Sequence, residues 1–227
     1  MDDVRLLSTL GLLGAMRRVT AACEAATGVR IDADFAPTQA LLPRLRAGEI
    51  ADIAILTREG LDEMIKEGRV AADSAVDLAR SYVGLAVKAG RLHPDISSES
   101  TLRQTLREAR CIAYSRLGAS GIYFAELIER LGVAADVNAR AIVVPQGLTA
   151  ERLLTDEADL AVQQISELKQ VAGIEIVGPI PRELQTPSVF SAGRMNSARN
   201  VAAADRLLRY LASPEVAPVL RDSGLEP

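Results

Sequence analysis

Hydroxyl, amide and glycine residues recur at four places where a strand-like segment gives way to a helix-like one. The four corners contain Ser8, Thr9 and Gly11; Thr38 and Gln39; Ser115, Ser120 and Gly121; and Gln146, Gly147 and Thr149. At the carboxyl ends of parallel strands, such corners lie where ligands bind in open α/β sheets. Each offers backbone N–H groups without an intrahelical acceptor and the positive end of a helix dipole. Several corners together would therefore bind an anion with neutral donors, whereas ordinary helix capping explains each corner taken alone.

The third corner, with the sequence "SRLGASG" over 115–121, has the densest pattern. Its glycines leave the backbone N–H groups accessible, and Ser120 is expected to cap the helix that follows. Two glutamines, Gln163 and Gln164, end the apolar segment "LAV" over 160–162. They are either the polar end of a strand or contacts to a ligand.

Strand-like and helix-like hydrophobic patterns alternate along the chain, and this order predicts an α/β fold whose strands are mostly parallel. We expect strands over 3–8, 29–36, 51–56, 81–90, 110–115, 138–145, 159–164, 174–181 and 187–195. We expect helices over 10–28, 38–49, 58–68, 97–109, 120–132, 148–158, 164–173, 197–213 and 214–224, with Thr38 as the N-cap of the second. No internal repeat or long linker interrupts this order.

The composition excludes several classes of function. The chain has 227 residues and a net charge of −4, and no basic run exceeds two residues, which argues against a nucleic-acid role. The single histidine, His93, and two distant cysteines cannot form a zinc site, so we expect no metal and no cofactor. Cys23 and Cys111 are expected to be buried free thiols in different parts of the fold.

The charges around the first apolar run are in the reverse of the order found in a signal peptide. Two aspartates precede it and Arg17 and Arg18 follow it, whereas a signal peptide begins with basic residues. We therefore expect a strand and a helix of the folded domain here. Any signal peptide would lie upstream of this sequence.

The order of motifs resembles the periplasmic molybdate-binding protein family, the substrate-binding components of ABC transporters with a two-lobed type II fold. The similar segments are "LLGAM" over 12–16, "TGVRIDADFAPTQALLPRLRAGEIADIAIL" over 27–56, "ASGIYFAELIERLG" over 119–132, "EADLAVQQISE" over 157–167 and "YLASPEVAPVLRDSGLEP" over 210–227. Parts of the chain also resemble the branch of this family that includes aconitate isomerases.

The resemblance implies one lobe from residues 1–80 and 187–227, and a second lobe from 81–186, with a ligand cleft between them. The implied ligand contacts are Ser8, Thr9, Gly11, Thr38, Ser120, Gln146, Gly147 and Gln164. It further implies a monomer that binds a small anion in the periplasm and delivers it to a membrane permease of an ABC transporter. A cytoplasmic location stays open as an alternative.

Two departures from the family pattern favour an organic carboxylate over molybdate. Gln164 stands where the family has a tyrosine hydroxyl, and its amide has both a donor and an acceptor. Gly11 stands where the family has a serine, and we expect it to leave room for a larger ligand. Arg80 and Arg116 are further candidates to meet a carboxylate.

Two other functions remain open on the same scaffold. An isomerase of a small tricarboxylic acid would need a general base, for which Tyr114 and Tyr123 are candidates. A ligand-sensing domain of a regulator is the other alternative, although the sequence contains no DNA-binding segment.

Overall fold

The computed structural model describes residues 2–227, and its chain divides into two units. Unit 1 comprises Met1–Ser81 and Ser188–Pro227, and unit 2 comprises Tyr82–Pro187. The chain therefore passes from one unit to the other twice, between Ser81 and Tyr82 and between Pro187 and Ser188. Each passage lies one residue from the lobe boundary expected from the sequence.

Unit 1 is built on a five-stranded sheet with the order β2-β1-β3-β10-β4. Its strands are β1 (Asp2–Ser8), β2 (Val29–Phe35), β3 (Ile53–Thr57), β4 (Val76–Ser81) and β10 (Ser188–Arg194). β1 is parallel to β2 and β3, while β10 is antiparallel to β3 and β4. Four strands thus share one direction, and β10, which re-enters the unit from unit 2, runs against them.

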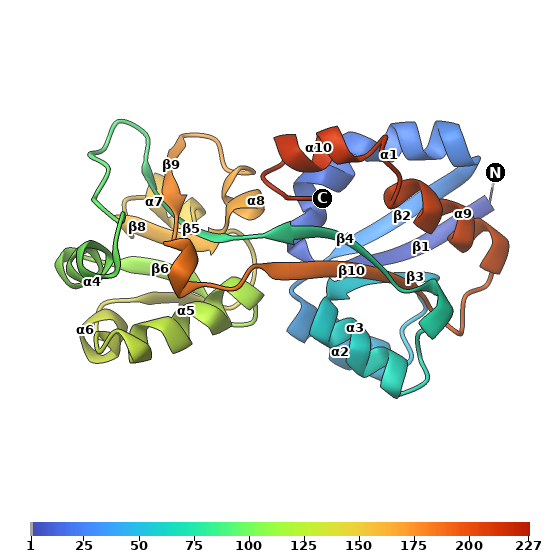
Figure 1. Ribbon diagram of the computed structural model, residues 1–227, viewed down its shortest axis with the longest axis horizontal. Helices are drawn as coiled ribbons and strands as arrows, with labels where there is room; N and C mark the ends of the chain where they lie inside the picture. Colours follow the sequence, from blue (N-terminus) through green and yellow to red (C-terminus); the bar gives the residue numbers. More distant parts are fainter. Residues whose placement is uncertain (1) are drawn as a thin grey trace. The chain divides into compact units, whose positions relative to one another are not determined.

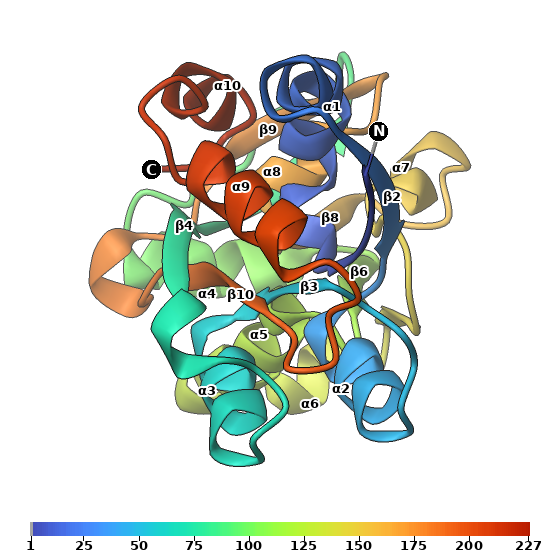
Figure 2. The same ribbon diagram turned by 90° about the vertical axis from the view of Figure 1, so that its right-hand side faces the viewer.

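Helices cover both faces of this sheet (Figure 1). α1 (Leu13–Thr27), α9 (Val201–Leu211) and α10 (Ala217–Asp222) lie on one face, and α2 (Thr38–Arg46) and α3 (Arg58–Lys66) lie on the other, as Figure 2 also shows. Each face has its own buried apolar cluster, one around Leu6 and Phe190 and the other around Leu7 and Leu56. Neighbouring residues of β1 therefore point into different cores, as a strand buried on both faces requires.

Unit 2 repeats the same plan with the strand order β7-β6-β8-β5-β9. Its strands are β5 (Val83–Lys88), β6 (Ile112–Ser115), β7 (Ile142–Val144), β8 (Leu160–Gln164) and β9 (Ile174–Pro179). β6 is parallel to β7 and β8, and β5 is antiparallel to β8 and β9. α4 (Glu99–Glu108), α5 (Ala119–Arg130) and α6 (Ala134–Asn138) cover one face; α7 (Glu151–Leu154) and α8 (Ile165–Leu168) cover the other (Figure 1).

The expected α/β fold is confirmed, with local corrections. β4 and α6 were not expected from the sequence, and β7 has three residues where eight were expected. The N-terminal segment forms a strand and a helix, as expected. Cys23 and Cys111 are buried free thiols in different units, also as expected.

Candidate functional site

The carboxyl ends of β6, β7 and β8 meet at one edge of the unit 2 sheet. Ser115 at the end of β6 lies opposite Val144 at the end of β7, and Tyr114 lies opposite Val162 in β8. Because the three strands are parallel, the loops that follow them leave the sheet from the same edge. Ser120, Gln146 and Gly147 lie in the segments that follow β6 and β7, and Gln164 is the last residue of β8.

The loop after β6 leads directly into the N-terminus of α5. Gly118 is the N-cap and the helix begins at Ala119, so Ser120 is the second helical residue and does not cap the helix. The prediction of a Ser120 cap was therefore wrong. The amides of Gly121 and Ile122 donate to the Gly118 carbonyl at 3.0 and 3.1 Å, whereas the amides of Ala119 and Ser120 have no intrahelical acceptor.

Two serine hydroxyls are buried beside this helix N-terminus without a hydrogen-bond partner. The residues are Ser115, which is 4% exposed, and Ser120, which is 1% exposed. A buried polar group left unpaired costs about 1–3 kcal/mol, so native proteins rarely keep two of them close together. Their position beside two amides without helical acceptors makes this corner the best candidate for an anion site.

The glycines of this corner are required by close packing against Ser115. A Cβ at Gly121 would overlap the Ser115 carbonyl oxygen and would lie 2.5 Å from the Ser115 hydroxyl. A Cβ at Gly118 would lie 2.7 Å from the same hydroxyl. The first turn of α5 therefore packs directly on Ser115. The Ser115 hydroxyl points at the helix N-terminus rather than into the core.

The side chain of Gln163 positions the neighbouring loop after β7. Its carbonyl oxygen accepts from the backbone N–H of Thr149 at 2.8 Å and from the Thr149 hydroxyl at 3.0 Å. Its amide nitrogen donates to the carbonyl of Gly147 at 3.0 Å. Gly147 has a φ of 97°, a conformation that favours glycine, and Gln146 beside it is exposed. Gln163 thus has a structural role, while Gln164 ends β8 and is the N-cap of α8.

A buried carboxyl group, Glu167, completes this network and was not found by the sequence analysis. Glu167 is 6% exposed and accepts hydrogen bonds from the backbone N–H of Gln164 and the side chain of Gln163. Burial raises its pKa to about 7, and the two hydrogen bonds oppose this effect. Its place as the third residue of α8, bonding back to the N-cap amide, is the glutamate half of a capping box. That spacing is the signal that could have found it.

The hydroxyl residues at the corners of unit 1, Ser8 and Thr38, are buried, and both form hydrogen bonds within the unit. The Thr38 hydroxyl accepts from the backbone N–H of Thr57 at 3.1 Å, and the Ser8 hydroxyl donates to the carbonyl of Thr9 at 3.1 Å. Thr38 is the first helical residue of α2, and its N-cap is Pro37, so the prediction of a Thr38 cap was wrong.

Gly11 does not provide the room that the sequence analysis expected. A Cβ at this position would overlap the ring of Phe190, which packs against the glycine from β10. The absent side chain is therefore replaced by a core aromatic ring and not by open space. The backbone amide of Gly11 remains a candidate ligand contact, but Gly11 leaves no room for a larger ligand.

The two tyrosines considered as general bases are both engaged in packing. The Tyr114 hydroxyl donates to the side-chain oxygen of Asn138 at 2.9 Å, and the Tyr123 hydroxyl donates to the carbonyl of Leu184 at 3.1 Å. Burial raises the pKa of Tyr114, and it raises the pKa of Tyr123 to about 12. A base for neutral pH needs the opposite shift, so these features do not favour proton transfer by either tyrosine.

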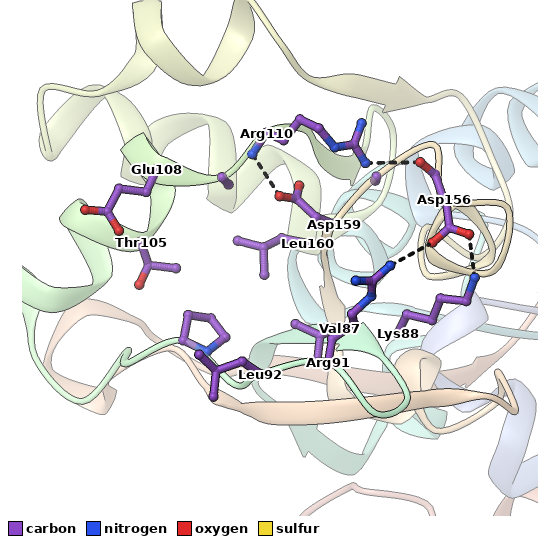
Figure 3. Close-up of a pocket in the computed structure, with 13 residues that line it drawn as sticks. Val87, Lys88, Arg91, Leu92, Thr105, Glu108, Arg110, Asp156, Asp159 and Leu160 are labelled. Atoms are coloured by element: carbon purple, nitrogen blue, oxygen red, sulfur yellow. Dashed lines mark hydrogen bonds and ion pairs between the residues drawn. The ribbon is translucent and has the colours of Figure 1, made fainter.

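A large recess of about 570 Å³ lies at the other end of unit 2, beside the start of β8 (Figure 3). Its two aspartates are already bound by other groups of the recess. Asp156 pairs with Lys88 at 2.6 Å and with Arg91 at 3.7 Å, and the carboxylate of Asp159 accepts from the backbone N–H of Arg110 at 2.8 Å. Ligands of open α/β sheets bind at the carboxyl ends of strands, so we interpret this recess as a feature of the surface.

Neither a metal site nor a membrane span is found in the described part of the chain. Over residues 2–227, no three histidine, cysteine, aspartate or glutamate side chains are grouped so as to hold a metal ion. In the same residues, no helix combines the length and the apolar character needed to cross a bilayer.

Two lobes, each a five-stranded sheet covered by helices on both faces, define the fold of the periplasmic binding proteins. The model of the bacterial extracellular solute-binding proteins matches residues 4–226, and the chain belongs to this family. It is 39% identical over 233 residues to an aconitate isomerase from Pseudomonas sp., covering 100% of this chain and 88% of the relative.

Solved structures of low sequence identity share the fold. The periplasmic molybdate-binding protein of Azotobacter vinelandii is 16% identical, with a TM-score of 0.84 and 99% of both chains covered. A periplasmic thiamin-binding protein is 17% identical, with a TM-score of 0.78 and coverage of 99% of this chain and 83% of the other. These structures support the resemblance seen in the sequence at the level of fold.

Proposed function

We propose that this protein binds a small tricarboxylate of the aconitate class and interconverts its double-bond isomers. The observation that carries the binding step is the pair of buried, unpartnered hydroxyls at the N-terminus of α5. The reaction and the ligand class are supported by the aconitate isomerase that is 39% identical over the whole of this chain.

The chemistry of the corner suits a carboxylate. The amides of Ala119 and Ser120 and the hydroxyls of Ser115 and Ser120 are donors, and hydrogen bonds to a charged oxygen are about twice as strong as neutral ones. The positive end of the α5 dipole adds to the attraction. The proposed contact set joins Ser115 to the contacts that the resemblance implies: Ser8, Thr9, Gly11, Thr38, Ser120, Gln146, Gly147 and Gln164.

The proposed reaction is a proton shift. A proton leaves the CH₂ carbon of the ligand, the double bond moves by one position, and a proton is returned to the carbon at the other end of the three-carbon unit. The reaction needs no oxidant, reductant or cofactor. We do not assign the proton transfer to Glu167, because Gln163 and Gln164 already bind its carboxyl group in the scaffold of the loop.

The second candidate function is delivery of the same class of ligand to the membrane permease of an ABC transporter, without chemistry. Membership of the extracellular solute-binding family favours it. Such a protein would act outside the cytoplasm as a monomer.

Proton NMR of cis- and trans-aconitate separates the two functions. Each isomer is incubated with the protein, and the vinyl proton signals report any interconversion. We expect both isomers to reach the same ratio from either side. Binding by calorimetry without interconversion would favour delivery, and binding of molybdate with no response to citrate or aconitate would refute the carboxylate proposal.

The serine hydroxyls give a sharper test of the site. Ser115→Ala and Ser120→Ala should each weaken carboxylate binding by about 1.5–3 kcal/mol, because each removes a hydrogen bond to a charged group. The stability of the ligand-free protein should stay unchanged or rise, since an unpaired buried hydroxyl is removed. Ser197→Ala, at an exposed position in unit 1, is the control. A loss of stability without a loss of affinity would assign the serines to the scaffold instead.

A further inference from the structure

Arg116, the residue after Ser115, is a cation at the carboxyl end of β6. The backbone N–H of Arg116 donates to the carbonyl of Val144 at 2.8 Å, which extends the pairing of β6 with β7 beyond Ser115. Continued by one residue, this register places Arg116 opposite Pro145, the neighbour of Gln146. The backbone of Arg116 is thereby fixed between the α5 corner and the loop after β7.

The Arg116 side chain is exposed, and its guanidinium forms no ion pair or hydrogen bond with residues 2–227. An arginine at another strand end, that of β3 in unit 1, behaves differently. There Arg58 pairs with Asp62 at 3.0 Å and with Asp77 at 3.1 Å. Arg58 is thus paired within unit 1, whereas Arg116, the residue next to Ser115 in the chain, has no acidic partner among the described residues.

Neutral donors alone cannot distinguish a polycarboxylate from a simple anion. Ser115, Ser120 and the first amides of α5 can satisfy one carboxylate group, but a tricarboxylate has two more negative groups within a few bonds. A guanidinium binds a carboxylate through two parallel hydrogen bonds, which an ammonium cannot reproduce.

We propose that Arg116 is a specificity-determining residue that pairs with a second carboxylate of the ligand whose first carboxylate binds at Ser115 and Ser120. This inference rests on the proposed function and adds to it the reason that a polycarboxylate is preferred. Arg116 favours ligands that have a second carboxylate, whereas the α5 corner binds one anionic group of any kind.

Calorimetry with three ligands tests the proposal: trans-aconitate, succinate and acetate, measured at low and moderate salt. Arg116→Gln removes the charge, and Arg116→Lys keeps the charge but not the paired hydrogen bonds. Arg103→Gln is the matched control, because Arg103 is also an exposed arginine of unit 2 without an ion pair but lies on α4.

We expect Arg116→Gln to weaken trans-aconitate binding at least tenfold relative to Arg103→Gln. Succinate binding should also weaken, because succinate has a second carboxylate, whereas acetate binding should weaken by less than twofold; Arg116→Lys should give an intermediate loss. The salt dependence of trans-aconitate binding should also decrease in Arg116→Gln. If the wild-type protein binds trans-aconitate and Arg116→Gln binds it as tightly as Arg103→Gln does, the role of Arg116 is refuted while the proposed function stands. Failure of the wild-type protein to bind any carboxylate would refute the proposed function and this inference together.

Discussion

Replacement of the buried carboxyl group in Glu167→Gln should change how stability depends on pH. The pKa of Glu167 is raised from 4.5 to about 7 in the folded protein. Between these values the folded state keeps a proton that the unfolded chain has released, so the free energy of unfolding falls as the pH rises. The penalty is absent below pH 4.5 and complete above pH 7. At about 1.4 kcal/mol for each pH unit, it amounts to about 3 kcal/mol.

Glutamine has nearly the shape of the protonated glutamate and cannot ionise. Glu167→Gln and the wild-type protein should therefore have similar stability near pH 4.5, and the variant should be more stable by about 3 kcal/mol above pH 7. Urea denaturation at constant ionic strength from pH 4.5 to 8 measures this difference. Glu129→Gln, on the exposed face of α5, controls for the loss of one surface charge. Parallel pH profiles of the variant and the wild-type protein would refute the reasoning.

Three further predictions test the scaffold. Gly121→Ala should destabilise the protein by about 3 kcal/mol in urea denaturation, because its Cβ meets a backbone oxygen that cannot rotate away; wild-type stability would contradict this packing. Thr38→Ala should cost about 1–3 kcal/mol by leaving the buried N–H of Thr57 unpaired, whereas Thr38→Ser should retain that hydrogen bond; equal losses in the two variants would show that the hydroxyl is not involved. Cys23, buried and with its pKa raised to about 12, should resist iodoacetamide at pH 8 until the protein is unfolded, as mass spectrometry would show; rapid labelling of the native protein would exclude a buried thiol.

Local patterns in the sequence predicted most of the fold. Strand and helix periodicity reflects residues two to four apart, and it gave the order of elements and the α/β class. It failed for β4, which the structure places at the edge of a sheet beside β10, more than a hundred residues away in the chain. It also failed for the five-residue helix α6, which is too short to show a period.

The sequence by itself determined that hydroxyls, amides and glycines stand at the corners of an α/β fold. Only the tertiary structure decided what each of them does. Phe190 fills the space beside Gly11, and Gln163 holds a loop fourteen residues away rather than a ligand. Ser115 and Ser120 are left buried without partners in one corner. Residue type fixes which hydrogen bonds a side chain can make, but its partners come from strands and loops that only the topology brings into contact.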